Sequence, residues 1–341
     1  METVAGMVCA GTGRPPARIG RTSISAHAAV RIEPAADGSG VRGSGISNSG
    51  ISGGVRDGGV RVSELRSEVP LVLRRTGVRL ESDDGLPTVT VHLVNAAAGP
   101  LAGDRLRLDI TVGAGVRLVL RSTAATVALP GHGEEPSLFD VHAEVGPGGA
   151  LEYLPEPTVA ARGCRHRMRA TIRLAADARL LWREEIVLGR FGEPPGSISS
   201  TLRVDVGGNV ENNAKDDIGK DIGAGRTVRP LLRQTLHLDP ATPGIDGPAI
   251  LGDARAVGSL LIAGPGPDGL GLSAGTTGTT GTTGTTGTTG IDTFAVLPLA
   301  GPGVLVSALA PGTVTLRRFL DAGATAVFTR NRPPNPPPAD R

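Results

Sequence analysis

The sequence predicts an all-β protein built from many short strands, with one or two helices near the C-terminus. Three observations predict this class. Apolar residues alternate with Arg, Asp or Thr at a period of two through much of the chain. Turns that contain Gly or Pro recur about every ten residues, which is the spacing of a sandwich, a barrel or a β-helix. Aromatic residues make up only 2% of the chain, so the core must consist of Val, Leu, Ile and Ala.

The alternating pattern places the expected strands in order along the chain. They are residues 71–73, 88–94, 104–112, 116–121, 167–174, 179–188, 229–238, 256–262, 292–298 and 303–309. One helix is expected over residues 311–321, with Thr313 as a candidate N-cap and Gly323 as its stop. Val314, Phe319 and Leu320 would share one face of this helix.

Composition divides the chain into three parts. Residues 1–60 are rich in Gly, Ser and Arg without a sustained apolar period, and we expect a disordered extension there. Residues 61–328 form the β domain, with flexible insertions at about 208–226 and 264–290. The Pro-rich tail 329–341 is expected to be disordered.

Bulk properties exclude several classes of partner. The net charge of +2 and the seven aromatic residues argue against nucleic-acid binding. The two cysteines do not make a disulfide framework, which suggests a reducing compartment. The N-terminal residues lack the basic and apolar regions of a secretory signal peptide, and the chain contains no long apolar run. We therefore expect a cytoplasmic protein without a membrane span.

Motifs for catalysis are weak. The G-x-G-x-x-G of residues 38–43 and the G-x-S-x-G of residues 50–54 lie in Gly/Ser-rich sequence without the strand and helix that either site requires. No Walker A sequence and no paired Cys or His motif of zinc spacing occurs. The sequence therefore predicts no catalytic centre and no tightly bound cofactor.

Carboxylates within apolar strands are the better candidates for a site. Asp104, Glu152 and Glu184 each fall in or next to an alternating segment, where a buried charge is costly unless it is paired or faces water. A polar passage for an ion would supply such a face, and carboxylates with an imidazole such as His92 could hold a divalent metal ion weakly. Ordinary salt bridges to nearby arginines are the alternative explanation.

Five segments in order resemble the urease accessory protein D family, also called UreD or UreH. A-G-D-R-L opens at Ala102, where the family has G-G-D-x-L, and R-S-T-A-A-T follows at Arg121. G-P-G-G-A-L-E-Y-L-P-E-P begins at Gly146 and is similar to the family's G-P-G-A-x-L-E-W-L-P core. The segments 179–190 and 229–236 continue the resemblance, so the chain is identified as an actinobacterial-type member with a low-complexity N-terminal extension.

The resemblance implies a two-layer, β-helix-like scaffold that is not an enzyme. It implies a urease maturation factor that works with accessory proteins F and G, docks on apo-urease and passes nickel transiently to the active site. It further implies a nickel passage with Asp104, Glu184, Glu152 and His92 as contacts.

Two more residues would belong to the polar wall of that passage, Arg190 and Gln234, and Gln234 stands where the family usually has an acidic residue. The alternatives are a β-helical carbohydrate-active enzyme, opposed by the single Trp and single Tyr, and an extracellular binding module.

Overall fold

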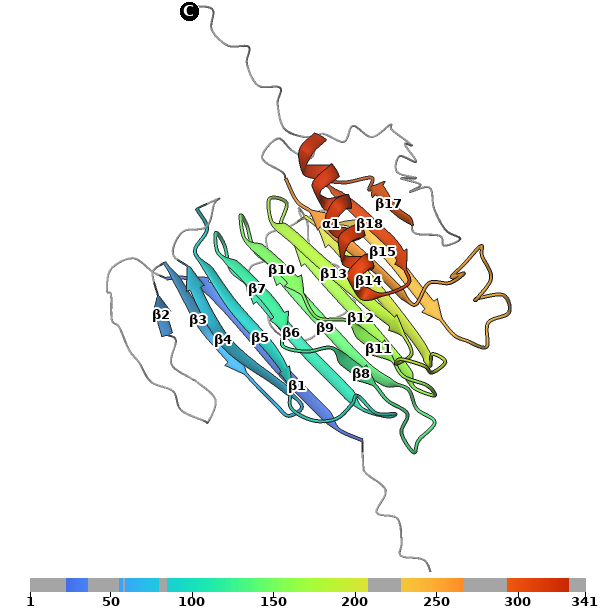
Figure 1. The fold of residues 1–341 in the computed structure, drawn as a ribbon. Coiled ribbons are helices and arrows are strands. Elements are labelled where there is room, and N and C mark those ends of the chain that lie inside the picture. Colours follow the sequence, from blue (N-terminus) through green and yellow to red (C-terminus); the bar gives the residue numbers. More distant parts are fainter. Residues whose placement is uncertain are drawn as a thin grey trace, which may run out of the picture.

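Two β-sheets face each other, and one helix packs on the outer side of the second sheet (Figure 1). The computed structural model describes residues 23–35, 55–57, 59–79, 85–207, 228–265 and 293–330. Sheet A has eight strands in the order β15-β14-β12-β9-β6-β1-β3-β2. Sheet B has ten strands, of which eight follow the order β17-β18-β16-β13-β10-β7-β5-β4 and two, β8 and β11, lie off this path. The all-β, two-layer prediction is confirmed.

The centre of both sheets is parallel. In sheet A the parallel run consists of β1 (Ser25–Pro34), β6 (Arg105–Val112), β9 (Ser137–Val145), β12 (Arg165–Leu174) and β14 (Ser197–Val206). In sheet B it consists of β5 (Thr88–Asn95), β7 (Arg117–Ser122), β10 (Ala150–Leu154) and β13 (Arg179–Leu188). The chain alternates between the sheets from β5 to β14, so it winds as a β-solenoid of about four turns.

Antiparallel strands close both ends of the solenoid. At one end lie β2 (Val55–Asp57), β3 (Val60–Arg66) and β4 (Leu71–Arg79). At the other end lie β15 (Arg229–Leu238), β16 (Ala256–Ala263), β17 (Thr293–Pro298) and β18 (Gly303–Ala310). Two short strands, β8 (Thr126–Ala128) and β11 (Thr158–Ala160), pair with each other, and β11 also pairs with β13.

Because side chains alternate along a strand, every second side chain of each strand lies between the two sheets. In β6, Leu106, Leu108 and Ile110 are at most 4% exposed, whereas the intervening Arg107 and Asp109 face outward. Aliphatic side chains from both sheets form one continuous core. Its turns stack tightly, because a Cβ at Gly149 would lie 2.7 Å from the carbonyl oxygen of Gly113 one turn away.

The expectation of a disordered extension over residues 1–60 is wrong for β1, β2 and the start of β3. Strand β1 lies inside sheet A, between β3 and β6, and its residues Ala26, Ala28, Val30 and Ile32 are buried. The alternation is present, but two of these four buried residues are alanine, which gives little contrast against a Gly/Ser-rich background. The expectations for residues 1–22 and 36–54 lie outside the described part of the chain.

The helix is longer than the sequence suggested. Helix α1 (Thr313–Arg330) continues through Gly323, where a Cβ would lie 2.4 Å from Cγ1 of Val306 on β18. Gly323 therefore permits close packing on sheet B instead of ending the helix. Leu316 and Leu320 are fully buried, whereas Val314 is 76% exposed, so the predicted face was wrong at Val314.

Three further expectations concern residues that are not described. The insertion at 208–226 falls within residues 208–227, and most of the insertion at 264–290 falls within residues 266–292. The expected tail of 329–341 lies beyond the described residues from position 331 onward. Within the described residues, no helix is long and apolar enough to cross a membrane.

Candidate passage between the sheets

A narrow cavity lies between the two sheets beside strand β13. Its volume is ≈ 60 Å³, which is room for about four water molecules. The stacked rings of Tyr153 and Trp182, with centroids 4.0 Å apart, form part of its wall. Glu184 and His166 are the titratable groups that face it from the inner sides of β13 and β12. The cavity is therefore apolar in its walls and carries a few convergent polar groups.

Glu184 is bound at both carboxylate oxygens. The hydroxyl of Ser200 donates to Oε2 at 2.6 Å, and the indole Nε1 of Trp182 donates to Oε1 at 3.1 Å. Burial raises the pKa of Glu184 above its usual value, although these two hydrogen bonds act in the opposite direction. The carboxyl group is thus held in place by two hydrogen bonds while burial disfavours its charged form.

His166 is the interior group that the sequence reasoning missed. Its Nδ1 lies 2.8 Å from the hydroxyl of Ser137, and burial lowers the pKa of the imidazole to about 4. The ring is therefore neutral at pH 7 and able to act as a weak metal ligand. The signal was available, because His166 occupies an inward position in a strand whose outward positions are Arg165, Arg167 and Arg169.

The other five predicted site residues lie outside the lining of this cavity. Glu152 pairs with Arg117 at 3.5 Å on the outer side of sheet B. His92 contacts the hydroxyl of Thr76 at 2.7 Å between β5 and β4. Gln234 lies on β15 at the edge of sheet A, opposite Leu202. The structure does not bring these residues to Glu184.

Arg190 belongs to the loop between β13 and β14. Its backbone N–H, Nε and terminal nitrogen all donate to the carboxylate of Glu193, at 2.8–2.9 Å. These bonds lower the pKa of Glu193 to about 2. In this structure Arg190 therefore stabilises the loop between β13 and β14 through its hydrogen bonds with Glu193.

Asp104 binds backbone groups of two separate segments and so has a structural role. It is 2% exposed, and its two oxygens accept the backbone N–H groups of Ile24 at 2.8 Å and Leu101 at 2.9 Å. These bonds join the start of β1 to the turn that precedes β6, and that turn also contains Gly103 with φ of 82°.

Replacement of Asp104 by Ala is expected to lower the free energy of unfolding by about 2 kcal/mol, because two part-buried N–H groups lose their acceptor. Urea denaturation followed by circular dichroism measures the change. The control is Glu144→Ala, since Glu144 is 42% exposed and pairs with Arg173 at 3.6 Å on the outer face. A loss no greater than that of the control would contradict the structural role of Asp104.

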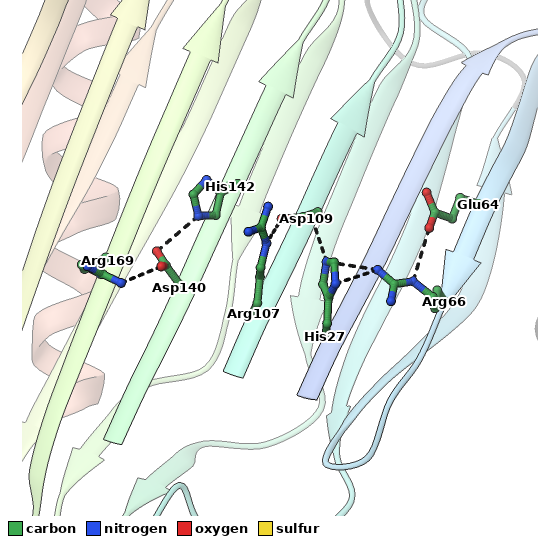
Figure 2. Close-up of polar contacts among 8 residues, drawn as sticks. All are labelled: His27, Glu64, Arg66, Arg107, Asp109, Asp140, His142 and Arg169. Atoms are coloured by element: carbon green, nitrogen blue, oxygen red, sulfur yellow. Dashed lines mark hydrogen bonds and ion pairs between the residues drawn. The ribbon is translucent and has the colours of Figure 1, made fainter. Parts of the chain in front are cut away.

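Charged residues on the outer face of sheet A are paired both within strands and between neighbouring strands (Figure 2). Asp109 contacts His27 at 2.7 Å and Arg107 at 2.8 Å. Asp140 contacts Arg169 at 2.7 Å and His142 at 3.5 Å. Burial alone would raise the pKa of Asp140, but its contacts with His142 and Arg169 outweigh burial and lower it.

These contacts pair Asp109, Asp140, His27 and His142 with other side chains of the same face. Within the described ranges, no group of three or more His, Cys, Asp or Glu side chains is arranged to hold a metal ion.

The chain is thus a β-solenoid protein with stacked turns, an outer face of paired charges and a narrow interior cavity. Comparison with known proteins gives the family. The family described as UreD urease accessory protein matches residues 51–340. The chain belongs to this family, whose members are non-catalytic factors in urease maturation and nickel metallocentre assembly.

Individual relatives agree with this result. The chain is 50% identical over 335 residues to the urease accessory protein UreD of Frankia casuarinae, covering 94% of this chain and 96% of the relative. It is 52% identical over 317 residues to the UreD of Frankia alni, covering 89% and 94%. The UreD of Streptomyces avermitilis is 37% identical over 264 residues, covering 77% and 89%. The resemblance found in the sequence is confirmed, and the alternative of a carbohydrate-active enzyme is set aside.

Proposed function

We propose that this urease maturation factor supports nickel delivery by offering a transient path between its two sheets. Accessory proteins F and G and apo-urease would be its partners, and the complex would form in the cytoplasm. The observation that carries the proposal is the interior cavity with Glu184 and His166 on its wall. These are an oxygen and a nitrogen ligand of the kinds that nickel accepts.

Weak binding is what a path requires. Two protein ligands hold a divalent ion less firmly than the four of a structural site, so the ion can move on. The pKa of Glu184 is raised by burial, so a proton competes with the ion for this carboxylate. Both features support transfer of the ion rather than its storage.

The role of the whole chain is tested by expressing the urease operon with and without this gene. We expect urease to assemble in both cases but to stay nickel-poor and inactive without the gene. Urease activity and the nickel content of purified urease are the two readouts. Equal nickel content at limiting nickel, with and without the gene, would overturn the proposed function.

The role of Glu184 is tested by Glu184→Ala in the same operon. We expect the nickel content of urease to fall below half at limiting nickel, because the path loses its interior carboxylate. Co-purification of the accessory proteins should be unchanged, since Glu184 faces inward. Glu144→Ala on the outer face is the matched control. Wild-type nickel loading by a folded Glu184→Ala variant would remove this residue from the path.

A further inference from the structure

Sheet B is interrupted beside the middle of β13. Strand β13 pairs with β10 through residues 179–182 and with β11 through residues 186–188. Arg183, Glu184 and Glu185 therefore lie between the two ladders, where the chain leaves the sheet at residues 155–157. In place of a ladder bond, the Arg183 guanidinium donates to the carbonyl oxygen of Pro155 at 3.2 Å. The result is a gap in the sheet that side chains fill.

The interior cavity extends to this gap. Its lining includes Trp182 and Glu184 from the inner side of β13, and also Glu185 and Glu156, which contact helix α1. Glu184 and Glu185 are consecutive in a strand, so their side chains point to opposite sides of the sheet. The lining of the cavity therefore includes two residues of the gap, Glu156 and Glu185, next to Glu184 on the inner face.

Arg317 of helix α1 covers the outer side of the gap. Its Nε lies 3.0 Å from both oxygens of Glu185, and its terminal nitrogen lies 2.9 Å from Glu185 and 2.7 Å from Glu156. The Glu185 side chain is 1% exposed, whereas those of Arg317 and Glu156 are 32% and 37% exposed. One guanidinium at the surface thus holds together two carboxylates at the outer end of the cavity.

We propose that the gap between β10 and β11 is a side opening of the interior cavity, and that Arg317 closes it and determines which ions pass. The inference rests on the proposed ion path. While Arg317 occupies both carboxylates, a cation meets a positive charge at the opening. When the guanidinium moves away, Glu156 and Glu185 present two oxygen ligands to a divalent cation and repel anions.

The only tryptophan of the chain reports on access to the cavity, because Trp182 is 1% exposed and lines its wall. The experiment measures quenching of Trp182 fluorescence by neutral acrylamide, by Cs⁺ and by iodide in the purified full-length protein. The test variant is the double substitution Glu185→Gln with Arg317→Gln, which removes the bridging charge without leaving a buried carboxylate unpaired. The control is Arg318→Gln, an exposed arginine of the same helix.

We expect low quenching constants for all three agents in the wild-type protein and in Arg318→Gln. In the double variant, the constants for acrylamide and Cs⁺ should rise several-fold, while that for iodide should rise less because Glu156 and Glu184 remain. A folded double variant with wild-type constants would overturn the proposal, and so would an equal rise in Arg318→Gln. The quenching measurement needs no nickel and no partner protein. Its outcome is therefore independent of the outcome of the urease operon experiment that tests the proposed function.

Discussion

Replacing Arg317 by Gln alone is expected to lower the free energy of unfolding by about 3 kcal/mol, the lower end of the range for breaking a buried ion pair. Glu185 would keep its charge in a site where its side chain is 1% exposed. Arg183, whose Nε lies 3.4 Å from Glu185, offsets part of the loss. It cannot offset all of it, because this Nε is buried without a hydrogen-bond partner.

Urea denaturation followed by circular dichroism measures the change in unfolding free energy. Adding Glu185→Gln to the Arg317→Gln variant should recover most of the lost stability, since no unpaired carboxylate then remains in the sheet. The recovery distinguishes a buried-charge effect from a simple loss of helix packing. Equal losses in the single and double variants would contradict the assignment.

Acidification from pH 7.5 to pH 5 is expected to remove about 2 kcal/mol of stability through His166 alone. The folded pKa of about 4 lies below the ordinary histidine value of 6.5. Between these two values the unfolded chain binds a proton that the folded protein does not bind. The contribution of His166 is therefore complete above about pH 6.5 and is lost as the pH falls toward 4.

The measurement is the unfolding free energy at both pH values for the wild-type protein and for His166→Asn. Asn keeps a polar group near Ser137 but does not titrate, so the variant should lose about 2 kcal/mol less than the wild type on acidification. His237→Asn, at a side chain that is 59% exposed, controls for the loss of a histidine as such. An identical pH dependence in His166→Asn and the wild type would contradict a buried neutral imidazole.

Only Glu184 among the predicted site residues lines the cavity, and the reason is the parity of positions along strands. Glu184 and Glu185 are equivalent in the sequence, yet one faces the cavity and the other contacts Arg317 of a helix 132 residues away. The period of two shows that they face opposite sides but not which side is interior. That depends on which face the second sheet covers.

Asp104 and His166 also have roles that local sequence does not reveal. Asp104 has the sequence context of a candidate ligand, but the strand that it holds begins 80 residues earlier, in a segment whose pattern is weak. His166 has no motif around it, and it matters because β12 brings it to the same cavity as β13. Pairing across such distances in the chain is not encoded in local propensity.

The amino-acid sequence was enough to predict the β class, the turn spacing, the family and the lack of a catalytic motif. These follow from local alternation, glycine placement and ordered motifs, which can be read along the chain. The three-dimensional structure was needed to show that the strands wind as a parallel solenoid, that β1 lies within sheet A, and that the gap beside β13 lies under Arg317. Those features arise from contacts between residues far apart in sequence. Burial in the packed structure determines which strands pair and which face of each strand is interior.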